Sequence, residues 1–290
     1  MLKLWVLEIV ARAASAVVQP PSALAPAIYT DPPHDSAHPA CMAVLHIPSG
    51  GVAINGVAYL AEGAGSHPTV VLMHGLPGNE KNLDLAQAIR RAGWNVITFN
   101  YRGSWGSPGQ FSFAGTLKDA SAVMAFVRDP ANARSYGIDP SRIVLAGHSM
   151  GAWDAAMTGE QDPGVVGTVL ISGVNTAELP SEHSRLVLLL SKMMETLAGV
   201  TPEELANEIE QHRQAFDWRL HAKALARKPL LVLTADDRFG PAADQLVGEV
   251  RSMHGAHVAT LHVATDHSWS DARIQLENAV LEWLRQFQKQ

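Results

Sequence analysis

Short apolar segments alternate with amphipathic segments over most of this chain. The apolar runs lie at 69–73, 94–99, 143–146, 165–171, 230–234 and 258–263, and each has the length of a buried strand. Helical patterns lie between them, at about 79–92, 116–128 and 241–253, and a last one continues to about residue 287. This alternation predicts right-handed crossovers and a mostly parallel sheet, with ligand chemistry at the carboxyl ends of the strands.

A different pattern opens the sheet. Val52–Ile54 and Val57–Leu60 are short runs typical of strands, and they flank Asn55 and Gly56. An Asn-Gly pair between two such runs is a strong signal for a two-residue hairpin turn. The sequence therefore predicts an antiparallel hairpin at the start of the sheet.

The alternation stops at about 175–228, where the pattern is helical alone. Thr201-Pro202-Glu203-Glu204 has the spacing of a capping box with proline at the first helical position, which predicts a helix start. The run Leu186–Leu197 is apolar around most of a helix and includes Met193 and Met194. It reads as a helix packed against the sheet domain, or as a cap whose flexible methionines roof a substrate pocket. Both interpretations can hold at once.

The amino-terminal 40 residues differ in composition from the rest. Lys3 precedes an apolar stretch, and Ala23-Leu24-Ala25 resembles a small-residue cleavage site, as in a secretory signal. Glu8 and Arg12 interrupt that stretch, at a spacing that suits a charge pair on a retained helix. The pattern favours an exported or periplasmic protein, with a cytoplasmic one as the alternative. Residues 19–40 are rich in Pro and Ala, which indicates an extended arm on the surface.

Composition limits the classes of function. With 290 residues and 47% hydrophobic residues, the chain can form one α/β domain at 41–290 with a helical insertion. The net charge of -6, without a run of Lys or Arg, argues against a nucleic acid partner. Cys41 is the single cysteine, so neither an internal disulfide nor a cysteine-based metal site is possible. We expect no metal, no cofactor and no stable membrane insertion, because no uninterrupted apolar run reaches about 18 residues. Oligomeric state is not indicated.

The strongest chemical signal is Gly147-His148-Ser149-Met150-Gly151, a G-x-S-x-G pattern. It follows the apolar strand Ile143–Ala146 and precedes a helical segment, which is the context of a nucleophile elbow. The two glycines allow a tight, strained turn that raises the Ser149 hydroxyl above the sheet edge, with the positive end of the helix beneath it. Ser149 is therefore the candidate nucleophile.

A serine hydroxyl needs a base, and the base needs a carboxylate that holds its tautomer. Of thirteen histidines, His267 ends the last strand at the level of the elbow, whereas His262 lies within that strand and His74 and His148 belong to turns. His267 is the candidate base. Asp236 and Asp237 follow the strand at 230–234, and neighbours in one turn point in different directions, so we expect one of them to reach the histidine.

The order serine, acid, histidine, together with the elbow, resembles the α/β-hydrolase family over roughly residues 44–290. The segment His74-Gly75-Leu76-Pro77-Gly78 and the helical insertion resemble esterases and peptidases related to dienelactone hydrolase and prolyl oligopeptidase. This resemblance selects Asp237, which stands four residues before Pro241, although Thr234 replaces a usual glycine. It also implies an oxyanion hole made of the backbone N–H groups of Leu76 and Met150.

Further pocket candidates are aromatic, basic or methionine side chains near the same edge: Tyr101, Arg102, Trp105, Met193, Met194 and Trp269. For Tyr101, Arg102 and Trp105 the alternative is loop anchoring by the guanidinium and aromatic packing.

The expected function is cleavage of small-molecule carboxylic esters through an acyl-enzyme on Ser149. One alternative is an exopeptidase of the same architecture, for which the cap offers acidic anchors at Glu203, Glu204, Glu208 and Glu210. Two further hypotheses are acyl transfer to another acceptor and a non-catalytic, ligand-binding protein of the same fold.

Overall fold

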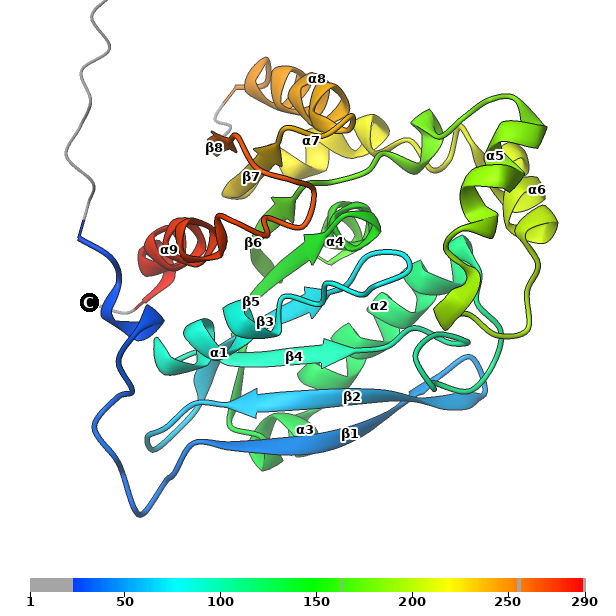
Figure 1. Ribbon diagram of the computed structural model, residues 1–290. Coiled ribbons are helices and arrows are strands. Elements are labelled where there is room, and N and C mark those ends of the chain that lie inside the picture. The colour runs from blue at the N-terminus through cyan, green and yellow to red at the C-terminus, as the bar shows by residue number, and fades with distance from the viewer. Residues whose placement is uncertain (1–22, 163, 255–256, 289–290) are drawn as a thin grey trace, which may run out of the picture.

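A central eight-stranded sheet organises the residues that the computed structural model describes, which are 23–162, 164–254 and 257–288. Its order is β1-β2-β4-β3-β5-β6-β7-β8 (Figure 1). The pairs β1–β2 and β2–β4 are antiparallel, and every pair from β4 to β8 is parallel. The strands are β1 (Cys41–Ser49), β2 (Val52–Leu60), β3 (His67–Met73), β4 (Asn95–Phe99), β5 (Ile138–His148), β6 (Val165–Ile171), β7 (Leu230–Ala235) and β8 (Val258–Val263). The alternation in the sequence thus predicted the parallel part correctly.

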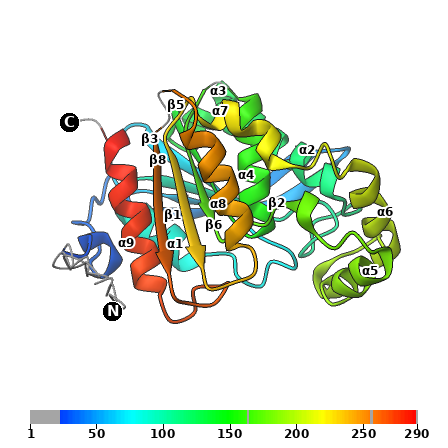
Figure 2. The ribbon, with the colours of Figure 1, turned by 90° about the horizontal axis from the view of Figure 1, so that it is seen from above.

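Helices cover both faces of this sheet. The helices of the described residues are α1 (Leu83–Arg91), α2 (Phe113–Arg128), α3 (Pro130–Ser135), α4 (Met150–Gln161), α5 (His183–Ser191), α6 (Pro202–His212), α7 (Ala222–Leu225), α8 (Gly240–Arg251) and α9 (Arg273–Leu284). Figure 2 shows α1 and α9 on one face and α2, α4 and α8 on the other. Two apolar cores result, one on each face, because the buried strands present side chains to both sides.

The opening hairpin exists, but the prediction of its turn was wrong. β1 and β2 pair from Cys41 with Leu60 to Ser49 with Val52, so Gly50 and Gly51 form the two-residue turn. Both glycines have positive φ, +56° and +85°, which that turn requires. Asn55 and Gly56 lie inside β2 instead. Gly56 passes so close to β4 that an added Cβ would lie 2.8 Å from the Thr98 carbonyl oxygen, and this close approach explains a glycine within the strand.

The insertion at 175–228 is helical, as expected. Its α5 and α6 project from the body of the molecule as a cap (Figure 1), whereas α7 packs against α4 and α8. α5 and α6 pack side by side, and the Thr201 capping box begins α6. The apolar run Leu186–Leu197 is not one helix, because α5 ends at Ser191 and a separate 3₁₀ turn, Met194–Thr196, follows. This turn lies against the loop after β4, where Ser104 pairs with Leu197.

Ser268 and Asp271 have the sequence spacing of a capping box for the last helix, but this box does not form. α9 begins at Arg273, with Ala272 as its N-cap, and the Asp271 carboxylate accepts a hydrogen bond from the Thr265 hydroxyl. The preceding loop folds around Asp266 instead, whose carboxylate accepts from the backbone N–H of Ser270 at 2.8 Å. Local polar contacts of the loop therefore replaced the expected helix cap.

The predicted signal-like segment falls on residues 1–22, outside the described residues. From residue 23 the chain lies against α1 and α9, and Ala25 is buried in the core on that face. The guanidinium of Arg91 donates to the carbonyl oxygen of Ile28 at 3.1 Å, which holds the arm on the surface. In the part of the chain that the structure describes, no helix has the length and apolar character to span a membrane.

Candidate active site

Ser149 occupies a strained turn between β5 and α4. Its φ is +59° and its ψ -121°, a conformation that costs free energy for any residue other than glycine. The flanking glycines make the turn possible: a Cβ on Gly147 would lie 1.9 Å from the Gly151 carbonyl oxygen, and one on Gly151 would lie 2.2 Å from the Met73 carbonyl oxygen. The backbone therefore has the geometry of a nucleophile elbow, and the side chain of Ser149 stands at the N-terminus of α4.

His267 and Asp237 are brought together by the loops that follow β8 and β7. Nδ1 of His267 and Oδ2 of Asp237 are 2.7 Å apart. Oδ1 of Asp237 accepts hydrogen bonds from the backbone N–H groups of Phe239 (2.8 Å) and Gly240 (3.1 Å). Burial raises the pKa of Asp237, but these hydrogen bonds outweigh it and hold the pKa below its ordinary value. The carboxylate is thus ionised and fixed toward Nδ1, which leaves Nε2 of His267 for proton transfer.

The neighbouring Asp236 points elsewhere. Its carboxylate lies 3.1 Å from Nε2 of His262, and both side chains are exposed. The other nitrogen of His262 lies 3.0 Å from the Thr234 hydroxyl, across the β7–β8 pair. The two adjacent aspartates therefore contact different histidines, as the sequence reasoning expected of neighbours in one turn.

His148, the residue before Ser149, supports the loop that carries His267. Its Nε2 donates a 2.8 Å hydrogen bond to the backbone carbonyl oxygen of His267, and the two rings are 4.9 Å apart. Burial lowers the pKa of His148 to about 4, so this imidazole is neutral near pH 7. The elbow and the histidine loop are in this way connected by a buried, uncharged contact.

The loop after β3 passes directly against the elbow. A Cβ on Gly75 would lie 2.7 Å from Cβ and 3.2 Å from Oγ of Ser149, so a glycine is needed for this approach. The His74 side chain stabilises this loop, because its Nδ1 donates a hydrogen bond to the Gly75 carbonyl oxygen at 2.7 Å. Leu76 follows at once and lines the same pocket as Ser149 and Met150. As the first residue of α4, Met150 has an N–H without a partner in its own helix.

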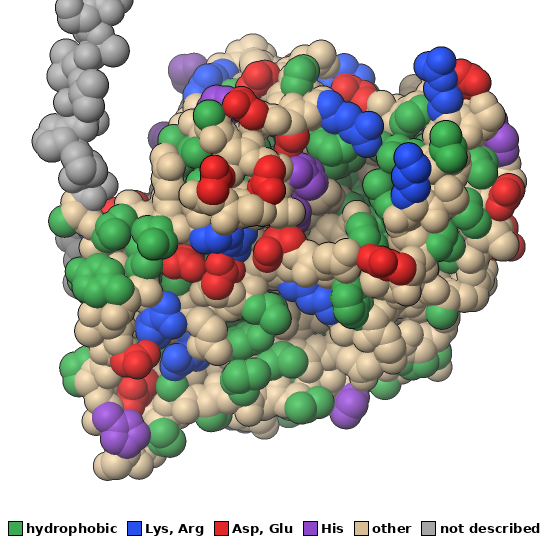
Figure 3. Space-filling view, viewed as in Figure 1, with side chains coloured by type: hydrophobic (Ala, Val, Ile, Leu, Met, Phe, Trp, Pro, Cys, Tyr) green, Lys and Arg blue, Asp and Glu red, His purple; other side chains and the backbone are tan. Residues whose placement is uncertain are grey.

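A cavity of about 140 Å³ opens above these residues. Ser149 and His267 both line it, and its other walls are mainly apolar side chains from the elbow, the cap and the loops after β6 and β7: Leu76, Phe113, Met150, Val174, Leu179, Leu189, Leu190, Met193 and Phe239, with Thr176 and Arg238. Figure 3 shows a hollow between the cap and the body of the molecule, with histidine side chains inside it. The candidate nucleophile and base, Ser149 and His267, therefore lie in the wall of an apolar cavity.

Of the six further pocket candidates, Met193 lines this cavity and the others do not. The Tyr101 hydroxyl donates to the His74 carbonyl oxygen at 3.2 Å, and Arg102 forms a 2.6 Å ion pair with Asp119. These contacts are the loop anchoring that the sequence left open as the alternative. The remaining candidates also have structural roles: Trp105 Nε1 donates to the Pro77 carbonyl oxygen, Met194 packs against the core, and Trp269 Nε1 donates to the Ser172 hydroxyl within the core.

Sequence reasoning missed several residues of the cavity wall. Val174 and Leu179 belong to the irregular segment after β6, where no periodic pattern marks an inward face. Phe239 was within reach, because it stands two residues after Asp237, and its ring lies 5.2 Å from that of His267. Arg238, between them in sequence, also lines the cavity.

The acidic cap residues considered as anchors for a peptide terminus lie outside this cavity. Glu208 accepts hydrogen bonds from the backbone N–H groups of Phe113 and Ala114, both at 2.8 Å, and so caps α2. Glu204 completes the capping box of α6, and Glu210 lies 3.1 Å from Nδ1 of His183. Among the described residues there is also no group of three or more His, Cys, Asp or Glu that could hold a metal ion.

Comparisons with known proteins agree with this architecture. A family model described as BD-FAE matches residues 58–165. An uncharacterized protein of Mycobacterium tuberculosis is 29% identical over 153 residues, which cover 52% of this chain and 53% of the relative. The mouse sn-1-specific diacylglycerol lipase ABHD11 is 28% identical over 209 residues, 63% of this chain and 64% of the lipase. The matched regions thus span about half to two thirds of these curated relatives.

Among solved structures, the thermophilic carboxylesterase EstE1 from a metagenomic library superposes with a TM-score of 0.65. It covers 91% of this chain and 92% of its own, with 21% sequence identity. The overlap extends over nearly the whole of both chains, so the two share one fold.

Proposed function

We propose that this chain, a member of the α/β-hydrolase superfamily, is a serine hydrolase that cleaves carboxylic esters. One observation carries the proposal: His267, hydrogen-bonded to Asp237, shares the wall of one apolar cavity with Ser149. In this mechanism Oγ of Ser149 attacks the ester carbonyl carbon while Nε2 of His267 takes its proton. The same proton then passes to the departing alcohol, and water releases the acid from the acyl-enzyme.

The groups around Ser149 suit the charge that this reaction develops. The carbonyl oxygen becomes negative in the tetrahedral intermediate, and the N–H groups of Leu76 and Met150 are the proposed donors to it, each worth roughly 3 kcal/mol of transition-state stabilisation. Asp237, held ionised by its neighbours, stabilises the imidazolium that His267 becomes. The reaction then needs no metal or cofactor.

The cavity supports an ester with a small apolar part. An engineered protein cavity of about 150 Å³ holds a benzene ring, and the cavity at Ser149 measures about 140 Å³. It therefore suits an apolar group of roughly six carbon atoms. Names of similar proteins, a carboxylesterase and a diacylglycerol lipase, also support esters as the substrate class.

A panel of p-nitrophenyl esters from acetate to palmitate tests the proposal. We expect kcat/KM to be highest for acyl chains of about four to eight carbons, since the cavity has about the volume that binds benzene. The Ser149→Ala variant should lose at least about 10⁴-fold in kcat and should no longer react with a fluorophosphonate probe. Ser191→Ala, which removes an exposed hydroxyl of α5, is the matched control and should behave as the unaltered protein. Labelling of Ser149→Ala would refute the assignment.

A further inference from the structure

A second cavity, of about 220 Å³, adjoins the one at Ser149. The two share parts of their walls, among them Val174, Leu179, Phe239 and Arg238. The second cavity is more polar, because Asn175 and Glu178 line it in addition to Arg238. A substrate bound with its apolar part near Ser149 would therefore reach a polar compartment next to the reacting bond.

Arg238 stands where the two compartments meet. Its guanidinium carbon lies 4.9 Å from the centroid of the Phe239 ring, and that ring lies 5.2 Å from the ring of His267. Arg238 is exposed, and within residues 23–162, 164–254 and 257–288 its guanidinium has no carboxylate within ion-pair distance and no hydrogen-bond acceptor. A guanidinium keeps its charge at any physiological pH and presents five donors that match carboxylate or phosphate oxygens.

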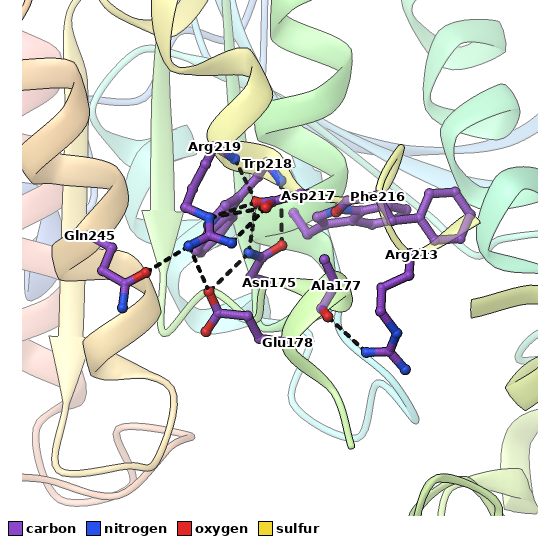
Figure 4. Close-up of polar contacts among 10 residues, drawn as sticks. Asn175, Ala177, Glu178, Arg213, Phe216, Asp217, Trp218, Arg219 and Gln245 are labelled. Carbon is purple, nitrogen blue, oxygen red and sulfur yellow. Dashed lines mark hydrogen bonds and ion pairs between the residues drawn. The ribbon is translucent and has the colours of Figure 1, made fainter. Parts of the chain in front are cut away.

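The carboxylate of Glu178, which lines the second cavity, already has polar partners. Oε1 of Glu178 lies 3.6 Å from Nη1 of Arg219 and 3.4 Å from the amide nitrogen of Asn175 (Figure 4). Arg219 in turn pairs with Asp217 at 2.7 Å and donates to Gln245 at 2.9 Å. The carboxylates of Glu178 and Asp217 thus both contact Arg219, whereas Arg238 lines both cavities.

We propose that Arg238 binds a carboxylate or phosphate group of the substrate, and that this chain selects esters carrying such an anion a few atoms from the scissile bond. This inference rests on the proposed ester hydrolysis. It makes Arg238 a specificity-determining residue, since the side chain contacts a remote part of the substrate and takes no part in bond breaking.

Three methyl esters of one acyl length test the charge preference directly. They are methyl hexanoate, monomethyl adipate and methyl 6-aminohexanoate, which end in a methyl group, a carboxylate and an ammonium group. Hydrolysis is followed by proton release at constant pH. We expect kcat/KM for the anionic ester to exceed that for the cationic ester by at least about tenfold, which corresponds to about 1.4 kcal/mol. A ratio of one or less would rule out recognition of an anion on the acyl side of the ester.

Matched variants assign the preference to its residue. Arg238→Gln should lower the anionic-to-cationic ratio to about one, and Glu178→Gln should raise it, because each removes one charge of opposite sign from the compartment. Arg227→Gln removes a guanidinium exposed outside both cavities and should leave the ratio unchanged. If Arg238→Gln lowered all three esters by the same factor, the residue would be structural and the proposal wrong.

A second pair of substrates distinguishes the two anion sources. 1-Hexanoylglycerol and its 3-phosphate differ only in a phosphate on the alcohol side, whereas adipate carries its charge on the acyl side. Preference for either anion, lost in Arg238→Gln, supports the proposal and identifies the side. Turnover of neutral esters without any anion preference would defeat this inference alone. Failure of the chain to hydrolyse every one of these esters would instead defeat the proposed function.

Discussion

Asp237 and Asp236 are adjacent in sequence, yet they contact different histidines: Oδ2 of Asp237 lies 2.7 Å from Nδ1 of His267, and Oδ1 of Asp236 lies 3.1 Å from Nε2 of His262. The side chain of Asp237 is 9% exposed and that of Asp236 is 64% exposed. A carboxylate that orients an imidazole is most effective where water does not compete for it. This difference in burial therefore supports Asp237 as the third member of the proposed triad.

Replacing the two aspartates separately tests that assignment. Asp237→Asn should lower kcat by about 10³ to 10⁴, since an amide at this position favours the wrong tautomer of His267. Asp236→Asn is the matched control and should change kcat by less than about twofold, because it loses only an exposed contact. Both are measured at saturating p-nitrophenyl butyrate. If Asp236→Asn were the more damaging variant, the acid would have to be reassigned to Asp236.

The contact between Gly75 and Ser149 leads to a second prediction. Gly75→Ala would place a methyl group 2.7 Å from Cβ of Ser149, so either the nucleophile or the loop must move. We expect kcat to fall by about 10² or more, because shifts of this size spoil catalytic geometry, while far-ultraviolet circular dichroism stays unchanged.

Gly248→Ala is the control for that experiment. Its added Cβ would meet no heavy atom within 4 Å, and the site is an exposed turn of α8. This variant should keep full activity and gain roughly 0.5 to 1 kcal/mol in stability, as alanine is the better helix former. Full activity of Gly75→Ala would show that the loop after β3 does not constrain Ser149.

A residue of the cap also contacts the loop after β3, which carries Gly75 and Pro77. Thr196 Oγ1 donates to the Pro77 carbonyl oxygen at 2.9 Å, and Trp105 Nε1 donates to that oxygen at 2.7 Å. Thr196→Val removes the first of these contacts at nearly constant shape. We expect kcat to fall by about three- to tenfold with KM unchanged, since Leu76, the residue before Pro77, is a proposed oxyanion donor that acts in the transition state. A rise in KM at constant kcat would indicate that the contact shapes the substrate pocket instead.

The parts of this site that the sequence could predict are those that depend on local pattern. The elbow at Ser149 and the loop position of His267 follow from strand and helix periodicity, because strand ends in a parallel sheet meet at one edge. Asp237 required a spacing argument from a resemblance, and its hydrogen bond to His267 could be seen only when two loops were placed together. The hairpin turn was misplaced because Asn55 and Gly56 fit a turn locally, whereas Gly50 and Gly51 fit the register of the whole strand pair.

The cavity wall was largely beyond sequence reasoning for the same reason. Val174 and Arg238 come from segments without periodicity, and their neighbours are set by how the cap packs on the sheet. Apolar character predicted that Leu186–Leu197 would be buried, but not that the helix would end at Ser191 and direct Met193 to the cavity. Packing between segments far apart in sequence thus determined where this helix ends and which side chains line the cavity, and local sequence patterns do not specify either.

The last prediction concerns a buried carboxyl on α4 behind the elbow. Asp154 is fully buried; its Oδ1 accepts a 2.6 Å hydrogen bond from the Thr116 hydroxyl, and its Oδ2 has no hydrogen-bond partner among the described residues. Burial raises the pKa of Asp154 to about 7. In the unfolded chain the carboxyl titrates near 3.9, so between about pH 4 and pH 7 the folded protein holds a proton that the unfolded chain has released. Stability from this group is therefore complete at pH 4 and is lost as the pH rises to 7.

Asp154→Asn keeps the shape of the side chain and removes the titration. The free energy of unfolding of this variant, minus that of the unaltered protein, should rise by up to about 4 kcal/mol between pH 4 and pH 7 and stay level above pH 7. His74 and His148, whose pKa values burial lowers to about 4, give both proteins the opposite slope, so their effect cancels in the difference. Urea unfolding at pH 5 and pH 8 measures it, with the exposed Asp244→Asn as the control. A difference independent of pH would mean that Asp154 is ionised in the folded protein throughout this range.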